Sequence, residues 1–310
     1  MSSSSIAHAA AHPRSHTHAP ASWPRVVLDT IRDHLEAPSA LFAAAVSFFA
    51  ALSLAPMLVL AVAMVGVIYG EDAARARLVS DVTTAMGTTP AAVIDELVRQ
   101  AALEQGRWWR VAIGVAIAAW GATGIFTRLQ ETLNALWGVQ LRKNLSWKQR
   151  LAVLVRKRLS SFLLIGVVGA LLLASMVLQS FGSGVAALAS ELPFGAWPWR
   201  VMQAATAVAL ATAVLVPIYR VLPDVELTWR DVLPGALLAA IVATLGAFGL
   251  GLYFGYAATR SLSGAAGGVL LLLLWMYFDA HVLLFGARFT RACVERRGRT
   301  IVPESHAERC

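Results

Sequence analysis

Long apolar stretches alternate with shorter polar connections along most of this chain. Each of six stretches is close to the ~20 residues that an α-helix needs to cross the hydrocarbon core of a membrane. They cover residues 41–69, 109–126, 159–178, 201–219, 232–254 and 267–289. The pattern predicts an all-α, polytopic membrane protein whose six transmembrane helices form one membrane domain at residues 37–292.

The connection at residues 70–108 carries a helical pattern of its own. Thr89 and Pro90 suit an N-cap and the first position of a helix, and apolar residues follow at helical spacing. The residues before Thr89 repeat apolar positions in the same way. We expect two amphipathic helices that form an external hairpin. The hairpin either packs over the mouth of the bundle, which we favour, or lies on the outer leaflet.

The composition agrees with a membrane protein. Charged residues make up 14% of the chain, whereas a soluble domain carries about 25%. The two cysteines, Cys293 and Cys310, both follow the last apolar stretch and provide neither a disulfide framework nor a CxxC metal site. We therefore expect no metal site and no cofactor.

Lysine and arginine are concentrated in alternate connections. Under the positive-inside rule, this bias places both termini in the cytoplasm. Anionic lipid headgroups are the expected partners of the basic side chains at the inner interface. These candidates are Arg142, Lys143, Arg156, Lys157, Arg158 and Arg288. The net charge is +8, but no aromatic residues are interleaved with the charges, so we expect no nucleic-acid binding.

The two ends of the chain are expected to be cytoplasmic tails. Residues 1–36 are rich in serine, alanine and histidine and are predicted to be disordered. The histidines in this tail would alternatively bind a metal loosely, but no acidic or cysteine partners accompany them. They are His8, His12, His16 and His18. Residues 293–310 are predicted to form a basic tail.

The helical pattern of the second span continues beyond the apolar stretch, through "GIFTRLQETLNALWGV" at residues 124–139. One side carries Leu129 and Leu133. The other side is polar and begins near Arg128. It contains Thr127, Gln130, Glu131 and Asn134. We expect this polar side to face inward, so Arg128, Gln130, Glu131 and Asn134 are candidates for a transport pathway.

Asp279 is an acidic residue in the middle of the last apolar stretch. A rise of about 1.5 Å per residue puts it roughly 18 Å below Gly267, close to the midplane of a core about 30 Å thick. Charged residues at this depth are costly and mark functional sites by default. Asp279 would either fix helix packing, for example through Trp275, or line a pathway. His281 points to the opposite side and is the second candidate on this helix.

Glycines crowd the fifth span, at positions 246, 249, 251 and 255. Small residues allow helices to approach closely. They also weaken helices that rearrange during transport. Close packing is the interpretation that these residues favour.

Four stretches resemble the YihY/BrkB family of bacterial inner-membrane proteins. They are "LFAAAVSFFAALSLAPMLVLAVAMVG", "TGIFTRLQETLNALWGV", "IYRVLPDVELTWRDVLPGALLAA" and "GAAGGVLLLLLWMYFDAHVLLFGARF". They occur in the family's order and at its separations, from about residue 38 to about residue 292. The third, with its YRxLP turn and its W-R-D-x-L-P-G-A start of the fifth span, is the most specific.

The resemblance implies a six-span protein of the bacterial inner membrane and offers no agreed catalytic residues. The family carries an old "ribonuclease BN" label that is regarded as a mistaken transfer, and members have been linked to serum resistance and envelope lipids. This chain departs from the family in its last span. Gly286-Ala287-Arg288 stands where the family usually reads Gly-Ala-Glu, and Asp279 stands where a small or polar residue is common.

The expected function is transport or flipping of a lipid or another amphiphilic envelope component. No ATP-binding motif is present, so the process would not be driven by ATP. The alternative is a membrane scaffold for envelope assembly that transports nothing. Envelope-assembly partners or a homo-oligomer are both compatible with the sequence. We expect no enzymatic activity, including ribonuclease activity, because no clustered His and Asp ligands occur.

Overall fold

A computed structural model of the chain describes residues 23–36, 38–103, 127–142, 197–258 and 265–309, with a few isolated positions besides. The predicted spans at 109–126 and 159–178 fall almost entirely outside the described residues. So do Lys143, Arg156, Lys157 and Arg158, and the four histidines of the N-terminal tail.

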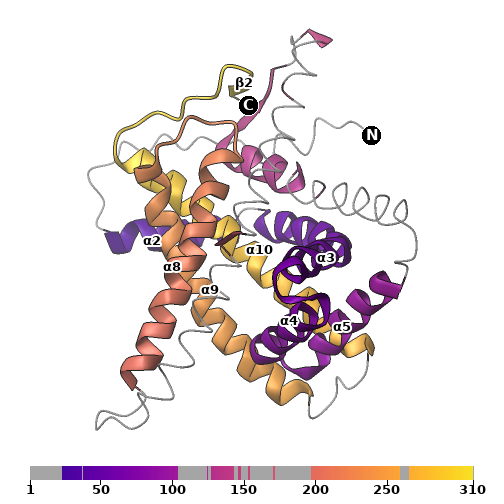
Figure 1. The fold of residues 1–310 in the computed structure, drawn as a ribbon. Helices are drawn as coiled ribbons and strands as arrows, with labels where there is room; N and C mark the ends of the chain where they lie inside the picture. Colours follow the sequence, from indigo (N-terminus) through magenta and orange to yellow (C-terminus); the bar gives the residue numbers. More distant parts are fainter. Residues whose placement is uncertain are drawn as a thin grey trace. The chain divides into compact units, whose positions relative to one another are not determined.

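The described structure is mostly helical (Figure 1). In chain order, the helices are α2 (Trp23–Glu36), α3 (Ser39–Tyr69), α4 (Glu71–Met86), α5 (Thr88–Leu103), α8 (Trp197–Val221), α9 (Trp229–Ala258) and α10 (Ala265–Arg296). A further helix occupies residues 127–137. Two short strands, β1 (Val139–Leu141) and β2 (Ala307–Arg309), pair in antiparallel orientation with Val139 opposite Arg309.

Three of the described helices contain segments long and apolar enough to cross a membrane. These segments are Val201–Val221, Trp229–Tyr253 and Gly267–Arg296. A fourth is added if Pro24–Glu36 and Ser39–Leu54 are counted together as one broken span. The three segments coincide with the predicted spans at 201–219, 232–254 and 267–289, and α3 covers the predicted span at 41–69. The described residues thus carry three or four candidate spans, and the full set of six stays a prediction.

The chain divides into two compact units. Unit 1 comprises Met1–Ala40, Leu129–Thr244 and Val282–Cys310, and unit 2 comprises Leu41–Arg128 and Leu245–His281. The long helices α9 and α10 each contribute one segment to each unit.

In unit 1, α9 and α10 approach each other at a pair of glycines. A Cβ added at Gly286 would lie 2.6 Å from the Ala239 Cβ, and one added at Gly235 would lie 2.5 Å from the Gly286 carbonyl oxygen. Ala236, Ala239 and Ala240 on α9 are fully buried. Small side chains therefore allow the two helices to pack almost backbone to backbone. The buried Tyr219 of α8 donates its hydroxyl to the Leu283 carbonyl oxygen at 2.7 Å.

In unit 2, α4 and α5 form the helical hairpin expected at residues 70–108. The two helices are joined by Gly87 alone, whose φ of 88° lies in the left-handed region that glycine tolerates. Helix α5 therefore begins at Thr88, one residue before the predicted N-cap. The Arg75 Nε donates to the Asp95 Oδ1 at 2.7 Å across the pair. This hydrogen bond lowers the pKa of the Asp95 carboxyl.

The hairpin packs against the beginning of α10. Ile94 of α5 shares a core cluster with Leu271 and Leu272. Gly268 faces the Thr89 carbonyl oxygen so closely that an added Cβ would lie 2.8 Å from it. The hairpin therefore has an apolar protein surface as its partner within unit 2.

The glycines of the fifth span differ in their surroundings. A Cβ added at Gly246 would overlap the ring of Phe278, whereas one added at Gly249 would meet nothing within 4 Å. Gly246 therefore fits the packing interpretation, and Gly249 does not take part in a close contact.

Two predicted boundaries differ from the structure. The tail predicted as disordered over residues 1–36 is helical from Trp23 onward, because Val26 packs with Phe289 and Cys293 of α10. The last span was predicted to end at residue 289, but α10 continues to Arg296. Its final turns stay ordered because Cys293 and Val294 are buried.

Candidate functional site

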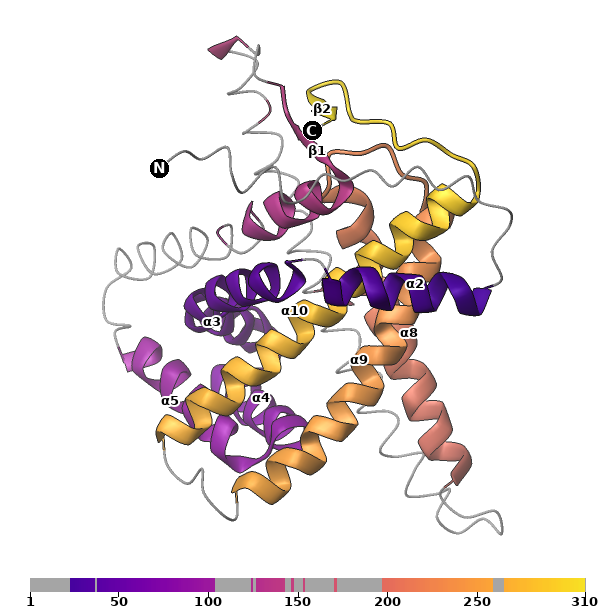
Figure 2. The ribbon, with the colours of Figure 1, turned by 180° about the vertical axis from the view of Figure 1, so that it is seen from behind.

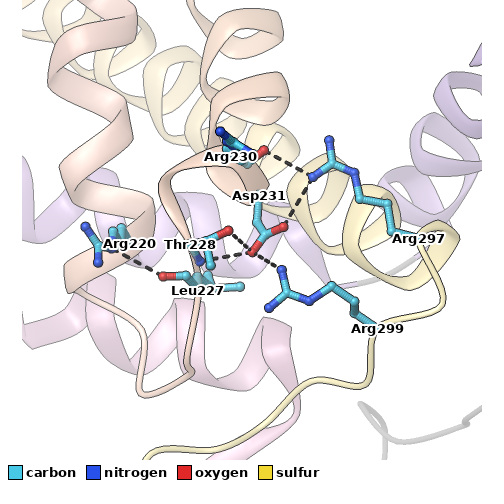
Figure 3. A network of polar contacts seen from close by, with 7 residues as sticks. All are labelled: Arg220, Leu227, Thr228, Arg230, Asp231, Arg297 and Arg299. Carbon is cyan, nitrogen blue, oxygen red and sulfur yellow. Dashed lines mark hydrogen bonds and ion pairs between the residues drawn. The ribbon is translucent and has the colours of Figure 1, made fainter.

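The connection between α8 and α9 carries two polar networks of unit 1. In the first, Asp231 in the first turn of α9 binds the residue that precedes this helix (Figure 3). Its Oδ2 accepts from the Thr228 amide at 3.0 Å and from the Thr228 hydroxyl at 2.5 Å. Arg299 Nη1 donates to the same oxygen at 2.6 Å, and Arg297 Nη1 donates to Oδ1 at 3.2 Å. The carboxylate thus fixes the N-terminus of α9 to the residues after α10.

Arg220, at the end of α8, contacts residues on the other side of the same connection. The Arg220 guanidinium carbon lies 3.9 Å from the centroid of the Trp229 ring, within the range of a cation–π contact. Its Nε also donates to the Leu227 carbonyl oxygen at 3.2 Å (Figure 3). The end of α8 and the start of α9 are therefore joined by side-chain contacts as well as by the backbone.

Replacing Asp231 by alanine is expected to lower the free energy of unfolding by about 2 kcal/mol, because a capping carboxylate with two arginine partners is lost. Asp231→Asn keeps an acceptor for Thr228 and should lose less. Thermal unfolding in detergent, followed by tryptophan fluorescence, measures both changes. If the alanine variant melts at the wild-type temperature, the network does not stabilise unit 1.

The second network surrounds Asp224, which is 4% exposed. Its Oδ1 accepts from Gln130 Nε2 at 3.1 Å, and its Oδ2 accepts from Asn134 Nδ2 at 2.7 Å. The Asp224 amide donates back to Asn134 Oδ1 at 2.8 Å. His306 Nε2 lies 3.3 Å from Asp224 Oδ1. We call these four residues, Gln130, Asn134, Asp224 and His306, the tail latch.

Backbone pairing continues the tail latch on both sides. The Glu304 amide donates to the Asp224 carbonyl oxygen at 3.0 Å, and the Glu226 amide donates to the Val302 carbonyl oxygen at 2.9 Å. Strand β2 then pairs with β1, and Arg142 Nε donates to the Ala307 carbonyl oxygen at 3.1 Å. The segment predicted as a basic tail is therefore held by hydrogen bonds over residues 301–309.

The polar stripe predicted for a pathway is divided among different environments. Gln130 and Asn134 belong to the tail latch, and Glu131 is exposed. The buried side of the helix is the apolar one, where Leu133 is fully buried. Two residues of the polar side, Gln130 and Asn134, thus face a buried protein partner, and the transport pathway itself stays a prediction. In unit 2, the guanidinium carbon of Arg128 lies 4.8 Å from the centroid of the Phe49 ring.

The two candidates on α10 in unit 2 both contact residues one turn earlier on the same helix. Asp279 is exposed and forms a hydrogen bond with the Trp275 side chain. His281 is half-buried, and its ring meets the Tyr277 ring edge to face, with 4.6 Å between centroids. Asp279 thus lies on the surface of a long apolar helix and accepts a hydrogen bond from an aromatic side chain of the same helix.

Two of the predicted headgroup candidates fall within the described residues. Arg142 is engaged by residues of the C-terminal segment, as given above. Arg288 is half-buried, and its electrostatic partners include Asp33 of α2. Among the described residues, no group of three or more His, Cys, Asp or Glu side chains is arranged to hold a metal ion.

Sequence reasoning did not single out Asp224, Asp231 or His306. Thr228 and Asp231 stand three residues apart at the start of an apolar run. This is the spacing of a capping box, so the pair could have been recognised in the sequence. Asp224 and His306 gave no such signal, because their partners lie far away in the sequence.

Long apolar helices with charged residues gathered at the connections define an integral membrane protein that crosses the bilayer several times. The family described as Virulence factor BrkB matches residues 30–309. The chain belongs to this family, as the resemblance of its motifs predicted.

Relatives in three bacteria are similar to this chain. A UPF0761 membrane protein of Chromobacterium violaceum is 29% identical over 58% of this chain and 41% of its own length. A Bacillus subtilis protein named as ribonuclease-like, YfkH, is 26% identical over 60% of this chain and 66% of its own length. A UPF0761 membrane protein of Tolumonas auensis is 36% identical over 24% of each chain. The chain thus spans less than two thirds of each of these relatives. No solved structure matches.

Proposed function

We propose that this protein moves an amphiphile, either a lipid or a lipid-linked envelope component, across the bacterial inner membrane without using ATP. Asp279 is the observation that carries the proposal. It lies near the middle of the candidate span Gly267–Arg296 and is exposed. The apolar side chains Leu270, Leu273 and Leu274 of the same helix are exposed as well.

A carboxylate at this depth needs water or a polar ligand, because an uncompensated charge in hydrocarbon is strongly disfavoured. The Trp275 indole has one N–H group and satisfies one acceptor site of the carboxylate at most. The remaining acceptor capacity of Asp279 supports a role in binding a polar headgroup or a proton on the transport path. In this proposal both termini face the cytoplasm, and membrane lipids are the partners.

A second candidate function is a membrane scaffold for envelope assembly that transports nothing. The tail latch favours it, because Gln130 and Asn134 are engaged in holding the chain together and are not available to a passing substrate. A homo-oligomer or envelope-assembly proteins would be the partners of such a scaffold. In neither proposal is the protein an enzyme.

The decisive experiment measures movement of a fluorescent lipid between leaflets in proteoliposomes, with and without a pH gradient. Asp279→Asn is expected to reduce the rate to about a tenth of wild type or less, a change of about 1.4 kcal/mol or more in the barrier. Asp72→Asn is the matched control, because Asp72 is exposed on α4 outside the candidate spans. If folded wild type moves no lipid under either condition, the scaffold becomes the better proposal.

A further inference from the structure

Helix α2 presents three different faces around its 14 residues. The first face is buried against the last turns of α10 within unit 1 (Figure 2). Val26 packs with Phe289 and Cys293, and the His34 ring meets the Phe285 ring edge to face at 5.8 Å. Because these partners lie in the final part of the span Gly267–Arg296, α2 lies at the level where that span reaches its end.

The second face of α2 is apolar and is not covered by any part of the chain that the structure describes. Leu28 is 63% exposed, Ile31 40% and Leu35 77%. At about 100° per residue, these three side chains fall within an arc of about 60° on the helix. Scattered single apolar residues are normal on protein surfaces, but three large ones on one arc form a contact surface.

The third face carries the charged residues, which are Arg25, Asp29, Arg32, Asp33 and Glu36. The same helical geometry places them in a separate arc of about 100°, between the buried face and the apolar face. Arg32 and Glu36 pair with each other at 2.9 Å at the surface of this arc. The three faces therefore suit three different surroundings, namely protein, an apolar phase and water.

We propose that α2 lies flat in the membrane interface beside the end of α10, with Leu28, Ile31 and Leu35 inserted between lipid headgroups and acyl chains. A helix of 14 residues is about 21 Å long, too short for a core about 30 Å thick, and its charged face excludes a transmembrane position. The apolar helix α3 begins at Ser39, three residues after α2 ends, so α2 is tethered at the membrane surface. Lipid is therefore the apolar phase within reach of the exposed face.

The charge on α2 indicates which lipids this face accepts. Arg25 and Arg32 are outnumbered by Asp29, Asp33 and Glu36. The helix accordingly carries no excess of positive charge for anionic headgroups. Insertion of α2 rests on the apolar side chains and does not depend on anionic lipid.

The test uses the full chain with Cys310 replaced by alanine and the buried Cys293 retained, reconstituted in phosphatidylcholine vesicles. Single cysteines at Leu28 or Leu35 carry an environment-sensitive fluorophore, and cysteines at Asp29 or Arg32 are the matched controls on the charged face. Nitroxide-labelled phosphatidylcholine is expected to quench the leucine positions at least about twofold more than the control positions, and aqueous iodide should show the opposite order. Adding phosphatidylglycerol should leave this order unchanged.

Two outcomes would overturn the proposal. If iodide quenches positions 28 and 35 as strongly as position 32, the apolar face is in water. If both quenchers fail at positions 28 and 35, protein covers the face, and a second copy of this chain is the occupant to be tested by cross-linking. Melting temperatures of the labelled variants show that each one is folded, since all four positions are exposed in the structure.

Discussion

Replacing Asp224 by alanine is expected to loosen the C-terminal segment and to lower the free energy of unfolding by about 3 kcal/mol. The carboxylate is buried and is the shared acceptor for Gln130, Asn134 and His306. Without it, the side-chain amide groups of Gln130 and Asn134 and the buried His306 ring lose their shared acceptor, and a buried polar group left unsatisfied costs about 1–3 kcal/mol. Thermal unfolding and limited proteolysis of residues 301–309 measure the two effects.

Glu226→Ala is the matched control for Asp224, since Glu226 lies two residues further along the same connection and is exposed. It should leave both the melting temperature and the protease resistance unchanged. Asp224→Asn retains one acceptor and should have an intermediate effect. An Asp224→Ala variant that behaves like Glu226→Ala would show that the tail latch contributes nothing to stability.

Gly286→Ala is expected to destabilise unit 1 by about 2 kcal/mol, because an added methyl group overpacks a tight helix crossing. The new Cβ would lie 2.6 Å from the Ala239 Cβ and would also meet the Tyr219 hydroxyl. Neither helix can move away without losing the contacts of its buried neighbours. Denaturation of the purified protein in detergent measures the loss, and Gly286→Leu should prevent folding altogether.

Gly249→Ala, also on α9, is not expected to lower the stability of the protein. A Cβ at Gly249 meets nothing within 4 Å, so only the helix propensity changes. Alanine is favoured over glycine inside a helix by about 1 kcal/mol, so this variant should be as stable as wild type or slightly more stable. Equal losses in the two variants would mean that the crossing at Gly286 is not a special contact.

The apolar helices could be predicted from the sequence because length and composition alone identify a membrane span. The predictions at 201–219, 232–254 and 267–289 therefore coincide with long helices. Helix α2 was missed because its charged residues resemble those of a tail. Its order depends on Phe289 and Cys293, which are supplied by a distant helix.

The polar chemistry was harder to predict than the helices. Gln130 and Asn134 were recognised as one side of a helix, but their partner Asp224 lies 94 and 90 residues away. A single sequence does not reveal pairs at such separations. The crossing at Gly235 and Gly286 was missed for a related reason, since each glycine stands alone in its own helix and the significance of both emerges only when the helices meet.

Unit 1 is built from three separate segments of the chain, and this affects how the protein folds during synthesis. Its three stretches are separated in the sequence by the stretches of unit 2. During translation, α2 emerges long before α10, so its partners Phe289 and Cys293 do not yet exist when it reaches the membrane. Unit 1 must therefore assemble late and over long sequence separations, which favours slow and chaperone-dependent maturation in the bilayer.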